Sequence, residues 1–204
     1  MLDELREKGI TSEEVLEAMD KVPRHLFLEK AFLEIAYQNK AFPIGCEQTI
    51  SHPYTVAFQT QLLEVEKGEK VLEIGTGCGY QTCVLAALGA KVFSIERQRP
   101  LFLKSQKLFK HLHVRVKSFY GDGYAGLPSF APFDKIIVTA GAPYIPDALK
   151  EQLAIGGVMV IPVGEGSKQE MKVVVKLSEN EYDITDLGTF SFVPLLEKKE
   201  WHND

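Results

Sequence analysis

The chain has 204 residues, of which 45% are hydrophobic and 25% are charged. This is ordinary globular composition, and the length suffices for one domain with a well-buried core. The formal net charge of −5 argues against a nucleic-acid partner, because such proteins concentrate cations to neutralise phosphates. The charged first residues predict no secretory signal, and no apolar run approaches the roughly 20 residues of a membrane span.

The three cysteines of the chain are Cys46, Cys78 and Cys83. Their number and spacing fit neither a disulfide framework nor a metal site. We therefore expect a cytoplasmic protein that binds no metal. The densest basic stretch lies at 104–117, and its first three lysines are spaced three apart on a predicted helix, which is typical of a solvated outer face.

The first 66 residues are predicted to form a helical extension and a substrate loop. Thr11 and Glu14 match a capping box at the start of a helix. Apolar residues recur on one face of that helix: Val15, Leu16, Met19 and Val22. A second short helix is predicted over 25–34. The segment 37–52 lacks periodicity and contains proline and glycine, so we expect a loop with little regular structure.

Another helix is predicted to begin at Pro53, because the residues that follow are apolar at helical spacing. Proline suits the first helical position, where its missing N–H costs nothing. The N-cap is then His52, so Ser51 lies one residue too early to make the usual serine cap. The hydroxyl group of Ser51 is therefore available for another role.

From Lys70 onward, short apolar strands alternate with helices. The predicted strands are 70–74, 91–95, 114–120, 134–140 and 157–164, and the predicted helices are 80–90, 100–112 and 146–154. Such alternation predicts an α/β fold with a mostly parallel central sheet and helices on both faces. After Gly164 the pattern changes to two strands around a short turn, which predicts an antiparallel C-terminal hairpin. We thus expect an α/β core over 67–164 and C-terminal strands over 165–204.

A glycine turn follows the first strand of this core. Gly75, Gly77 and Gly79 allow positive φ and let a ligand approach the backbone closely. Tyr80 stands where the dinucleotide fingerprint requires Gly or Ala, and no phosphate-loop lysine follows. Glu73 in the strand suits instead a ligand with an ammonium group and no phosphate. S-adenosylmethionine has these properties and is the predicted cofactor.

Two further acidic residues follow neighbouring strands. Glu96 ends the second strand, where an acid accepts both ribose hydroxyls in such folds. NAD would use the same acid, so Glu96 does not discriminate between the two cofactors. Asp122 lies between glycines after the third strand and can accept from an adenine amino group, although such a sequence is also a common turn. Together with the glycine turn, these acids predict one ligand-binding edge.

The chain resembles the protein-L-isoaspartate O-methyltransferase family over nearly its whole length. The matching stretches are 22–28, 41–45, 48–54, 71–82, 94–97, 121–140, 145–153, 156–164 and 192–195. The glycine motif alone is typical of S-adenosylmethionine-dependent methyltransferases in general. Joined to QTISHPY at 48–54, with APFD and FVPL downstream, it is far more specific. The resemblance implies a Rossmann-like fold and a single methyltransferase domain over 1–204.

The resemblance also implies a reaction: methyl transfer from S-adenosylmethionine to the free α-carboxylate of L-isoaspartyl residues in damaged peptides and proteins. S-adenosylhomocysteine is the other product, and the methyl ester then closes to a succinimide that hydrolyses partly to normal aspartate. The implied catalytic residue is Ser51. The implied cofactor-binding residues are Thr49, Ile50, Ser51, Glu73, Gly75, Thr76, Gly77, Gly79, Glu96, Arg97, Asp122 and Gly123.

Other functions stay open at this point. A methyltransferase that acts on a tRNA base or a small molecule would share the cofactor motif, although base methylation favours a cationic surface. A non-catalytic module that binds S-adenosylmethionine or a peptide would share it too. Tyr80 disfavours an NAD oxidoreductase, and the chain has no G-x-S-x-G elbow of a serine hydrolase.

Five residues depart from the family's common pattern: Cys46, Glu47, His52, Cys78 and Ser191. His52 and Ser191 predict a shifted peptide preference, and Glu47 makes the loop more acidic, which predicts weaker binding of anionic peptides. We expect a monomer, because a peptide substrate must reach an open edge of the sheet. Neither nucleic acid nor a membrane is an expected partner.

Overall fold

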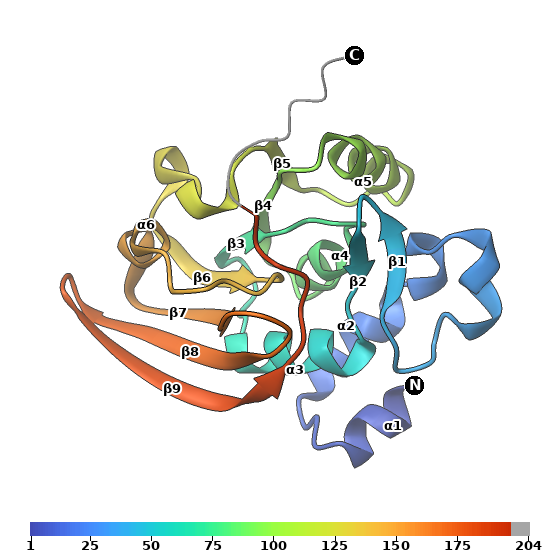
Figure 1. Cartoon of the computed structure of the whole chain (residues 1–204), viewed down its shortest axis with the longest axis horizontal. Coiled ribbons are helices and arrows are strands. Elements are labelled where there is room, and N and C mark those ends of the chain that lie inside the picture. Colours follow the sequence, from blue (N-terminus) through green and yellow to red (C-terminus); the bar gives the residue numbers. More distant parts are fainter. Residues whose placement is uncertain (197–204) are drawn as a thin grey trace.

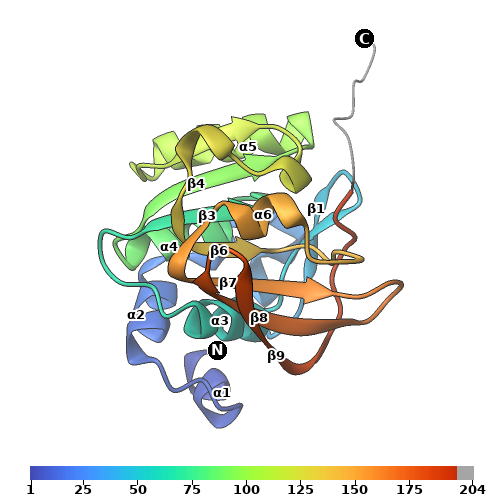
Figure 2. The same cartoon turned by 90° about the vertical axis from the view of Figure 1, so that its left-hand side faces the viewer.

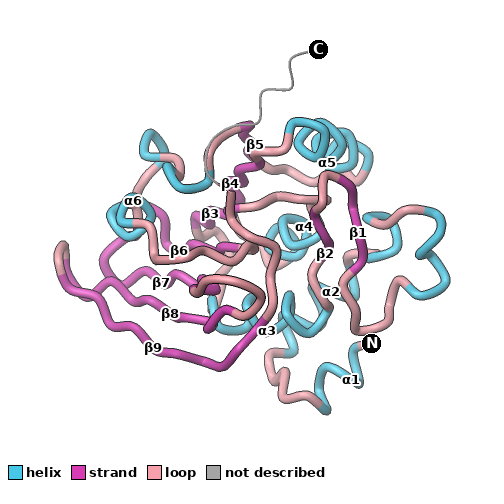
Figure 3. The backbone as a smooth tube through the Cα atoms, viewed as in Figure 1, coloured by secondary structure: helices cyan, strands magenta, loops and turns pink. Residues whose placement is uncertain are grey.

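The computed structural model describes residues 1–196, which form helices and strands in alternation (Figures 1 and 3). The helices are α1 (Leu2–Glu7), α2 (Glu13–Lys21), α3 (Pro53–Leu63), α4 (Tyr80–Ala87), α5 (Arg99–His111) and α6 (Asp147–Glu151), and the 3₁₀ helices are η1 (Arg24–Phe27), η2 (Lys30–Ile35), η3 (Gly123–Ala125) and η4 (Pro128–Phe130). The strands are β1 (Phe42–Gly45), β2 (Gln48–Ile50), β3 (Lys70–Ile74), β4 (Lys91–Glu96), β5 (Lys117–Tyr120), β6 (Phe133–Val138), β7 (Leu153–Val163), β8 (Gln169–Ser178) and β9 (Glu181–Phe190). Residues 197–204, the end of the predicted C-terminal part, lie outside the described residues.

The main sheet has seven strands in the order β5-β4-β3-β6-β7-β8-β9. Strands β3 to β7 pair in parallel, whereas β8 and β9 are antiparallel to their neighbours. Figures 1 and 2 show β8 and β9 as a long hairpin at one edge of the sheet. The predicted mostly parallel sheet with an antiparallel C-terminal hairpin is confirmed.

Helices pack on both faces of the sheet, as predicted. Successive side chains of a strand point to opposite faces, and β3 shows this directly. Val71 packs in one apolar cluster with Leu63 of α3 and Leu85 of α4. Its neighbour Leu72 packs in another cluster with Leu149 of α6. Figure 2 shows α6 beside β7, on the face that this short helix covers.

The N-terminal helix α2 buries the predicted apolar face, but its cap differs from the prediction. The N-cap is Ser12, whose hydroxyl accepts from the Val15 N–H at 3.3 Å. Thr11 instead donates its backbone N–H to Oε1 of Gln61 in α3 at 2.7 Å. The same oxygen accepts from the Ser12 N–H at 2.8 Å. A contact 50 residues away in the chain therefore moves the start of the helix by one residue.

The segment predicted as an irregular loop contains an antiparallel hairpin, β1–β2, so that prediction is wrong. Its two-residue turn consists of Cys46 (φ 51°) and Glu47 (φ 56°). Tight hairpins require positive φ at both turn positions, where glycine and asparagine are usual. Cysteine and glutamate give no such signal in the sequence. The predicted helix at 25–34 is also replaced, by η1 and η2.

The hairpin and the segment that follows β9 meet at the carboxyl ends of the parallel strands (Figure 1). The segment after β9, residues 191–196, is a loop (Figure 3). Two backbone hydrogen bonds connect it to Gly141, which lies just beyond β6. The Gly141 N–H donates to the Val193 carbonyl at 2.8 Å, and the Leu195 N–H donates to the Gly141 carbonyl at 2.8 Å. Over residues 1–196, we find no helix with the length and apolarity needed to traverse a bilayer.

Candidate active site

The glycine turn joins β3 to α4, and all three of its glycines have positive φ. A Cβ atom on Gly75 would lie 2.6 Å from Oγ1 of Thr139. A Cβ atom on Gly79 would lie 2.5 Å from the ring of Phe109 in α5. Gly75 therefore lets β6 approach the turn, and Gly79 lets α5 pack against it. Gly79 lines none of the three cavities described below, and its predicted contact with the cofactor stays a prediction.

Glu73, a second residue predicted to bind the cofactor, precedes the glycine turn in β3. Its carboxylate is completely buried beneath the glycine turn and lines none of the cavities described below. Oε2 accepts hydrogen bonds from the hydroxyls of Thr82 (2.5 Å) and Ser94 (2.6 Å). The Ser94 hydroxyl also bonds Oγ1 of Thr76 at 2.5 Å. This network anchors the turn from below, and burial raises the pKa of Glu73 to about 8.

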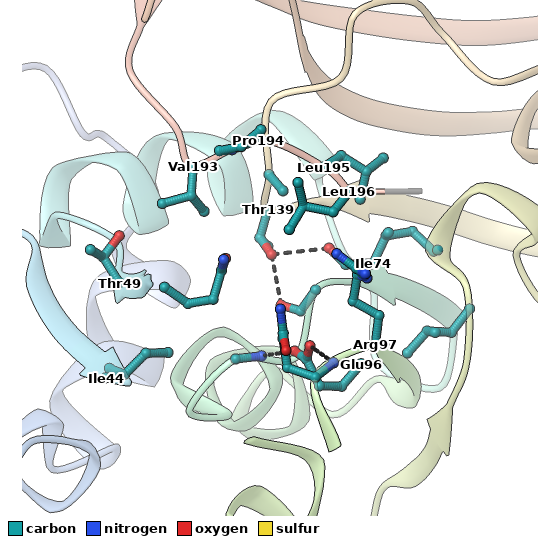
Figure 4. Close-up of a pocket in the computed structure, with 17 residues that line it drawn as sticks. Ile44, Thr49, Ile74, Glu96, Arg97, Thr139, Val193, Pro194, Leu195 and Leu196 are labelled. Carbon is teal, nitrogen blue, oxygen red and sulfur yellow. Dashed lines mark hydrogen bonds between the residues drawn. The ribbon is translucent and has the colours of Figure 1, made fainter. Parts of the chain in front are cut away.

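Glu96 lies at the carboxyl end of β4, as predicted, and its carboxylate faces the glycine turn (Figure 4). Oε2 accepts from the Gly77 N–H at 2.7 Å, and Oε1 accepts from the Gln98 N–H at 2.7 Å. Burial raises the pKa of Glu96, and these N–H groups oppose that shift. The carboxylate is thus held rigidly at the edge of the sheet.

A cavity lies directly above this carboxylate, and we call it the Glu96 cavity. Its walls come from six parts of the chain: the β1–β2 hairpin, the end of β3 with the glycine turn, the end of β4, η3, the residues just after β6, and the segment after β9 (Figure 4). Thr49, Gly75, Gly77, Arg97 and Gly123 of the predicted set all line it. Figure 4 also shows Val193 to Leu196 on the side opposite Glu96.

Asp122 does not line the Glu96 cavity, although its neighbour Gly123 does. The Asp122 carboxylate caps η3 by accepting from the Tyr124 N–H at 2.9 Å. A Cβ atom on Gly123 would lie 2.4 Å from Cγ2 of Ile74. At this strand end, the structure therefore places glycine backbone, and not the predicted carboxylate, on the wall of the cavity.

Two further cavities adjoin the first one. The Ser51 cavity is lined by Ile50, Ser51, Thr76 and the glycine turn, and the His52 cavity is lined by Ser51, His52, Ser191 and Phe192, among others. Thr49 and Thr139 line all three cavities. The three cavities therefore lie side by side, in an order that leads from the Glu96 carboxylate past Ser51 to His52.

Ser51 is half-buried between α3 and the hairpin. The N-cap of α3 is His52, proline follows it, and no side chain caps the helix. The prediction that Ser51 does not cap this helix is confirmed. The Ser51 carbonyl accepts from Nη2 of Arg24 at 2.7 Å, which fixes the backbone of the segment, and Ser51 lines two of the cavities.

Thr139 is the main site residue that the sequence analysis missed. It follows β6 directly, its N–H donates to the Ile74 carbonyl at 3.0 Å, and its hydroxyl donates to the Gly75 carbonyl at 2.7 Å. It therefore ties β6 to the glycine turn. The same reasoning that selected Glu96, a polar residue at the carboxyl end of a parallel strand, would have found it.

Fold and site together define the class of S-adenosylmethionine-dependent methyltransferases: a glycine turn after β3, an acidic residue that ends β4, and an acceptor cavity beside the turn. Comparison with known proteins narrows this class. The family model described as "Protein-L-isoaspartate(D-aspartate) O-methyltransferase (PCMT)" matches residues 1–200. The chain therefore belongs to the protein-L-isoaspartate(D-aspartate) O-methyltransferase family.

Individual relatives agree with this assignment. The chain is 60% identical to the protein-L-isoaspartate O-methyltransferase of Flavobacterium psychrophilum over 96% of its own length and 92% of that protein. It is 59% identical to the protein of the same name from Flavobacterium johnsoniae, with the same coverage of 96% and 92%. A crystal structure from Plasmodium falciparum, assigned to the same activity and bound to S-adenosyl-L-homocysteine, is similar with a TM-score of 0.85, 25% identity and 97% coverage of each chain.

Proposed function

We propose that this chain transfers the methyl group of S-adenosylmethionine to the free α-carboxylate of L-isoaspartyl residues in peptides and proteins. The observation that carries this proposal is the adjacency of the three cavities, which share Thr49 and Thr139 as lining residues. A donor beside Glu96 and an acceptor beside His52 would meet at Ser51. Repair would begin with this ester, because it can close to a succinimide.

The residues of the Glu96 cavity fit S-adenosylmethionine. The Glu96 carboxylate can accept from ribose hydroxyls, and no lysine or arginine of the turn is placed to bind a phosphate. Gly75, Gly77 and Gly123 form a cradle without side chains. When bound, the cofactor would supply an electrophilic methyl group on a sulfonium centre.

We assign the remaining predicted cofactor residues to this cavity by their positions. Thr49 and Ile50 would face the donor from the hairpin, and Arg97 from the end of β4. Glu73 and Thr76 would act indirectly, because their hydrogen bonds beneath the glycine turn would hold it in the shape that binds the cofactor.

The role of Ser51 would be to position the acceptor. An α-carboxylate has a pKa near ~3.5 and is ionised at neutral pH, so no general base is needed. The chemical task is to hold an oxygen in line with the methyl carbon and to exclude water, and such orientation can supply roughly 7–11 kcal/mol. The hydroxyl can bind one carboxylate oxygen while the other attacks, so Ser51 forms no covalent intermediate.

The peptide would lie across the His52 cavity, between the β1–β2 hairpin and the segment at 191–196. A monomer in a reducing cytoplasm is consistent with this open site and with the free thiols of Cys78 and Cys83. The acidic net charge of −5 favours a peptide over a nucleic acid as the acceptor. Light scattering during size exclusion would test the oligomeric state, and a dimer would contradict it.

The deciding experiment measures methyl transfer from labelled S-adenosylmethionine to two peptides that differ only in one L-isoaspartyl or one normal aspartyl residue. Transfer to the isoaspartyl peptide alone is the expected result. Cofactor binding without transfer to either peptide would refute the proposed acceptor and would indicate a different substrate or a sensor.

A further inference from the structure

Arg24 is completely buried, although arginine is rarely found inside a protein. It lies in η1, within the matching stretch 22–28, and it contacts three separate segments. Nε donates to the Ala36 carbonyl at 3.0 Å, and Nη2 donates to the carbonyls of Lys40 (3.2 Å) and Ser51 (2.7 Å). The guanidinium therefore joins the N-terminal part to the backbone of the candidate catalytic serine.

The charge of Arg24 has no counter-charge in the part of the chain that the structure describes. The groups that act on its pKa, after burial, are Tyr80, Cys78 and Tyr37, and none of these is a carboxylate. The guanidinium lies over the ring of Tyr80, with Cζ 5.0 Å from the ring centroid. Burial lowers the pKa of Arg24, yet an arginine keeps its charge in proteins. A buried, unpaired charge is costly, and this one persists next to Ser51.

We propose that Arg24 is a positioning residue whose charge attracts the substrate carboxylate. It fixes the backbone at Ser51, and its positive charge attracts the isoaspartyl α-carboxylate, which is the anion that the reaction brings next to Ser51. This inference rests on the proposed function.

The field of Arg24 reaches the acceptor side of the site. His52 lines the acceptor cavity, and its pKa is lowered first by burial and then by the charge of Arg24. Arg24 itself lines none of the three cavities. It therefore acts on the acceptor through space, across the Ser51 backbone.

This indirect attraction suits the reaction. A carboxylate loses its charge as it accepts a methyl group, so a cation bonded directly to it would stabilise the reactant over the transition state and slow the step. Because the identified hydrogen bonds of Arg24 go to backbone carbonyls, the carboxylate is drawn in without being fixed by the guanidinium. The neutral ester is no longer attracted, which favours its release.

The test compares the binding of two peptides in the presence of S-adenosyl-L-homocysteine. One contains L-isoaspartate, and the other contains L-isoasparagine, which has a neutral amide in place of the α-carboxylate. Their dissociation constants are measured by calorimetry for the wild type, R24M and R24K. We expect R24M to reduce the preference for the carboxylate about tenfold, a ratio equivalent to ~1.4 kcal/mol. R24K carries a charge only while its buried ammonium group stays protonated. Its preference for the carboxylate should therefore rise towards that of the wild type as the pH is lowered from about 8 to about 6, while kcat falls because Lys cannot reproduce the fork of donors.

Equal weakening of both peptides in R24M would show a merely structural role and overturn the proposal. R115M, which removes an exposed arginine from the opposite edge of the sheet, controls for net charge and should change nothing. Circular dichroism and the binding of S-adenosyl-L-homocysteine show whether each variant folds. If R24M does not fold, the ratio of the dissociation constants of the two peptides is measured for R24Q and compared with that of R24K. A wild type that fails to methylate the isoaspartyl peptide would refute the proposed function itself, whereas normal methylation with an unchanged R24M preference would refute only the role of Arg24.

Discussion

Replacing Glu73 by Gln should change how the stability of the protein depends on pH. Glu73 is completely buried, and burial raises its pKa from 4.5 to about 8. Between these two pH values, the folded protein holds a proton that the unfolded chain has released. Because the folded state then binds more protons, its free energy of unfolding must fall as the pH rises.

The size of this effect follows from the two pKa values. The difference between 4.5 and about 8 corresponds to ~5 kcal/mol, at about 1.4 kcal/mol for each pH unit. This stability is fully present below pH 4.5 and is lost by about pH 8. Gln cannot ionise, so E73Q should lack this slope. Protonated Glu73 already places an O–H group where Oε1 has no partner, and the Gln amide places an N–H group there. E73Q should therefore match the wild type within about 1 kcal/mol at pH 5 and be more stable, by ~4 kcal/mol, near pH 8.

Urea unfolding of the wild type and E73Q between pH 5 and 9 measures the difference between their free energies of unfolding. The other acidic residues are the same in both proteins, so their contributions cancel in this difference. E181Q, which replaces an exposed glutamate of β9, is the control and should give a profile parallel to the wild type. Parallel profiles for E73Q as well would refute the reasoning. Binding of S-adenosyl-L-homocysteine should weaken less than about tenfold in E73Q, because the carboxylate lies beneath the turn and does not meet the ligand.

Three further changes test the site. Ser51→Ala should lower kcat/KM roughly 100-fold, the effect of a ~1 Å misplacement, with unchanged affinity for S-adenosyl-L-homocysteine; a methylated or acylated Ser51 trapped in mass spectrometry would contradict this role. Glu96→Gln should weaken that affinity roughly 10- to 100-fold in calorimetry, because hydrogen bonds to a charged acceptor are lost; an unchanged affinity would remove Glu96 from the site. Gly79→Ala should lower the free energy of unfolding in urea by ~3 kcal/mol, and Gly9→Ala by ~1 kcal/mol. Both glycines have φ near +90°, but only at Gly79 would a Cβ atom meet Phe109. Equal losses of stability in the two variants would mean that the contact with the Phe109 ring is unimportant.

The sequence was sufficient for the parallel sheet because each of its signals is local. Each strand of the core is a short apolar run, and each is followed by a helix or a turn within a few residues. Parallel strands end at one edge, so the position of Glu96 in the chain already placed it near the glycine turn. The structure adds the contacts of its two carboxylate oxygens, which depend on how the turn folds back.

The orientation of Glu73 could not be read in the same way. In a half-exposed strand, the alternation of polar and apolar residues shows which side chains point inward. Both faces of β3 are covered, and four successive residues, Val71 to Ile74, are all buried. A carboxylate in such a strand gives no sign of whether it faces a ligand or other protein groups. The hydroxyls of Thr82 and Ser94, which determine the outcome, come from two other elements.

The two ends of the candidate site differ in charge: one end has the Glu96 carboxylate, and the other end lies near the Arg24 guanidinium. Among the described residues that line the three cavities, Glu96 is the single carboxylate, and it stands at the end farthest along the chain of cavities from His52. The raised pKa of Glu73, about 8, leaves that group mostly protonated at neutral pH, so the glycine turn carries little negative charge of its own. Near Ser51 the nearest fixed charge is the positive Arg24. If Arg24 and Glu96 act as proposed, the substrate carboxylate is attracted towards Ser51, where no other anion of the cavities competes, and the ribose hydroxyls of the methyl donor bind at Glu96. The methyl donor and its substrate would then be directed to opposite ends of the three adjacent cavities before any contact between them is made.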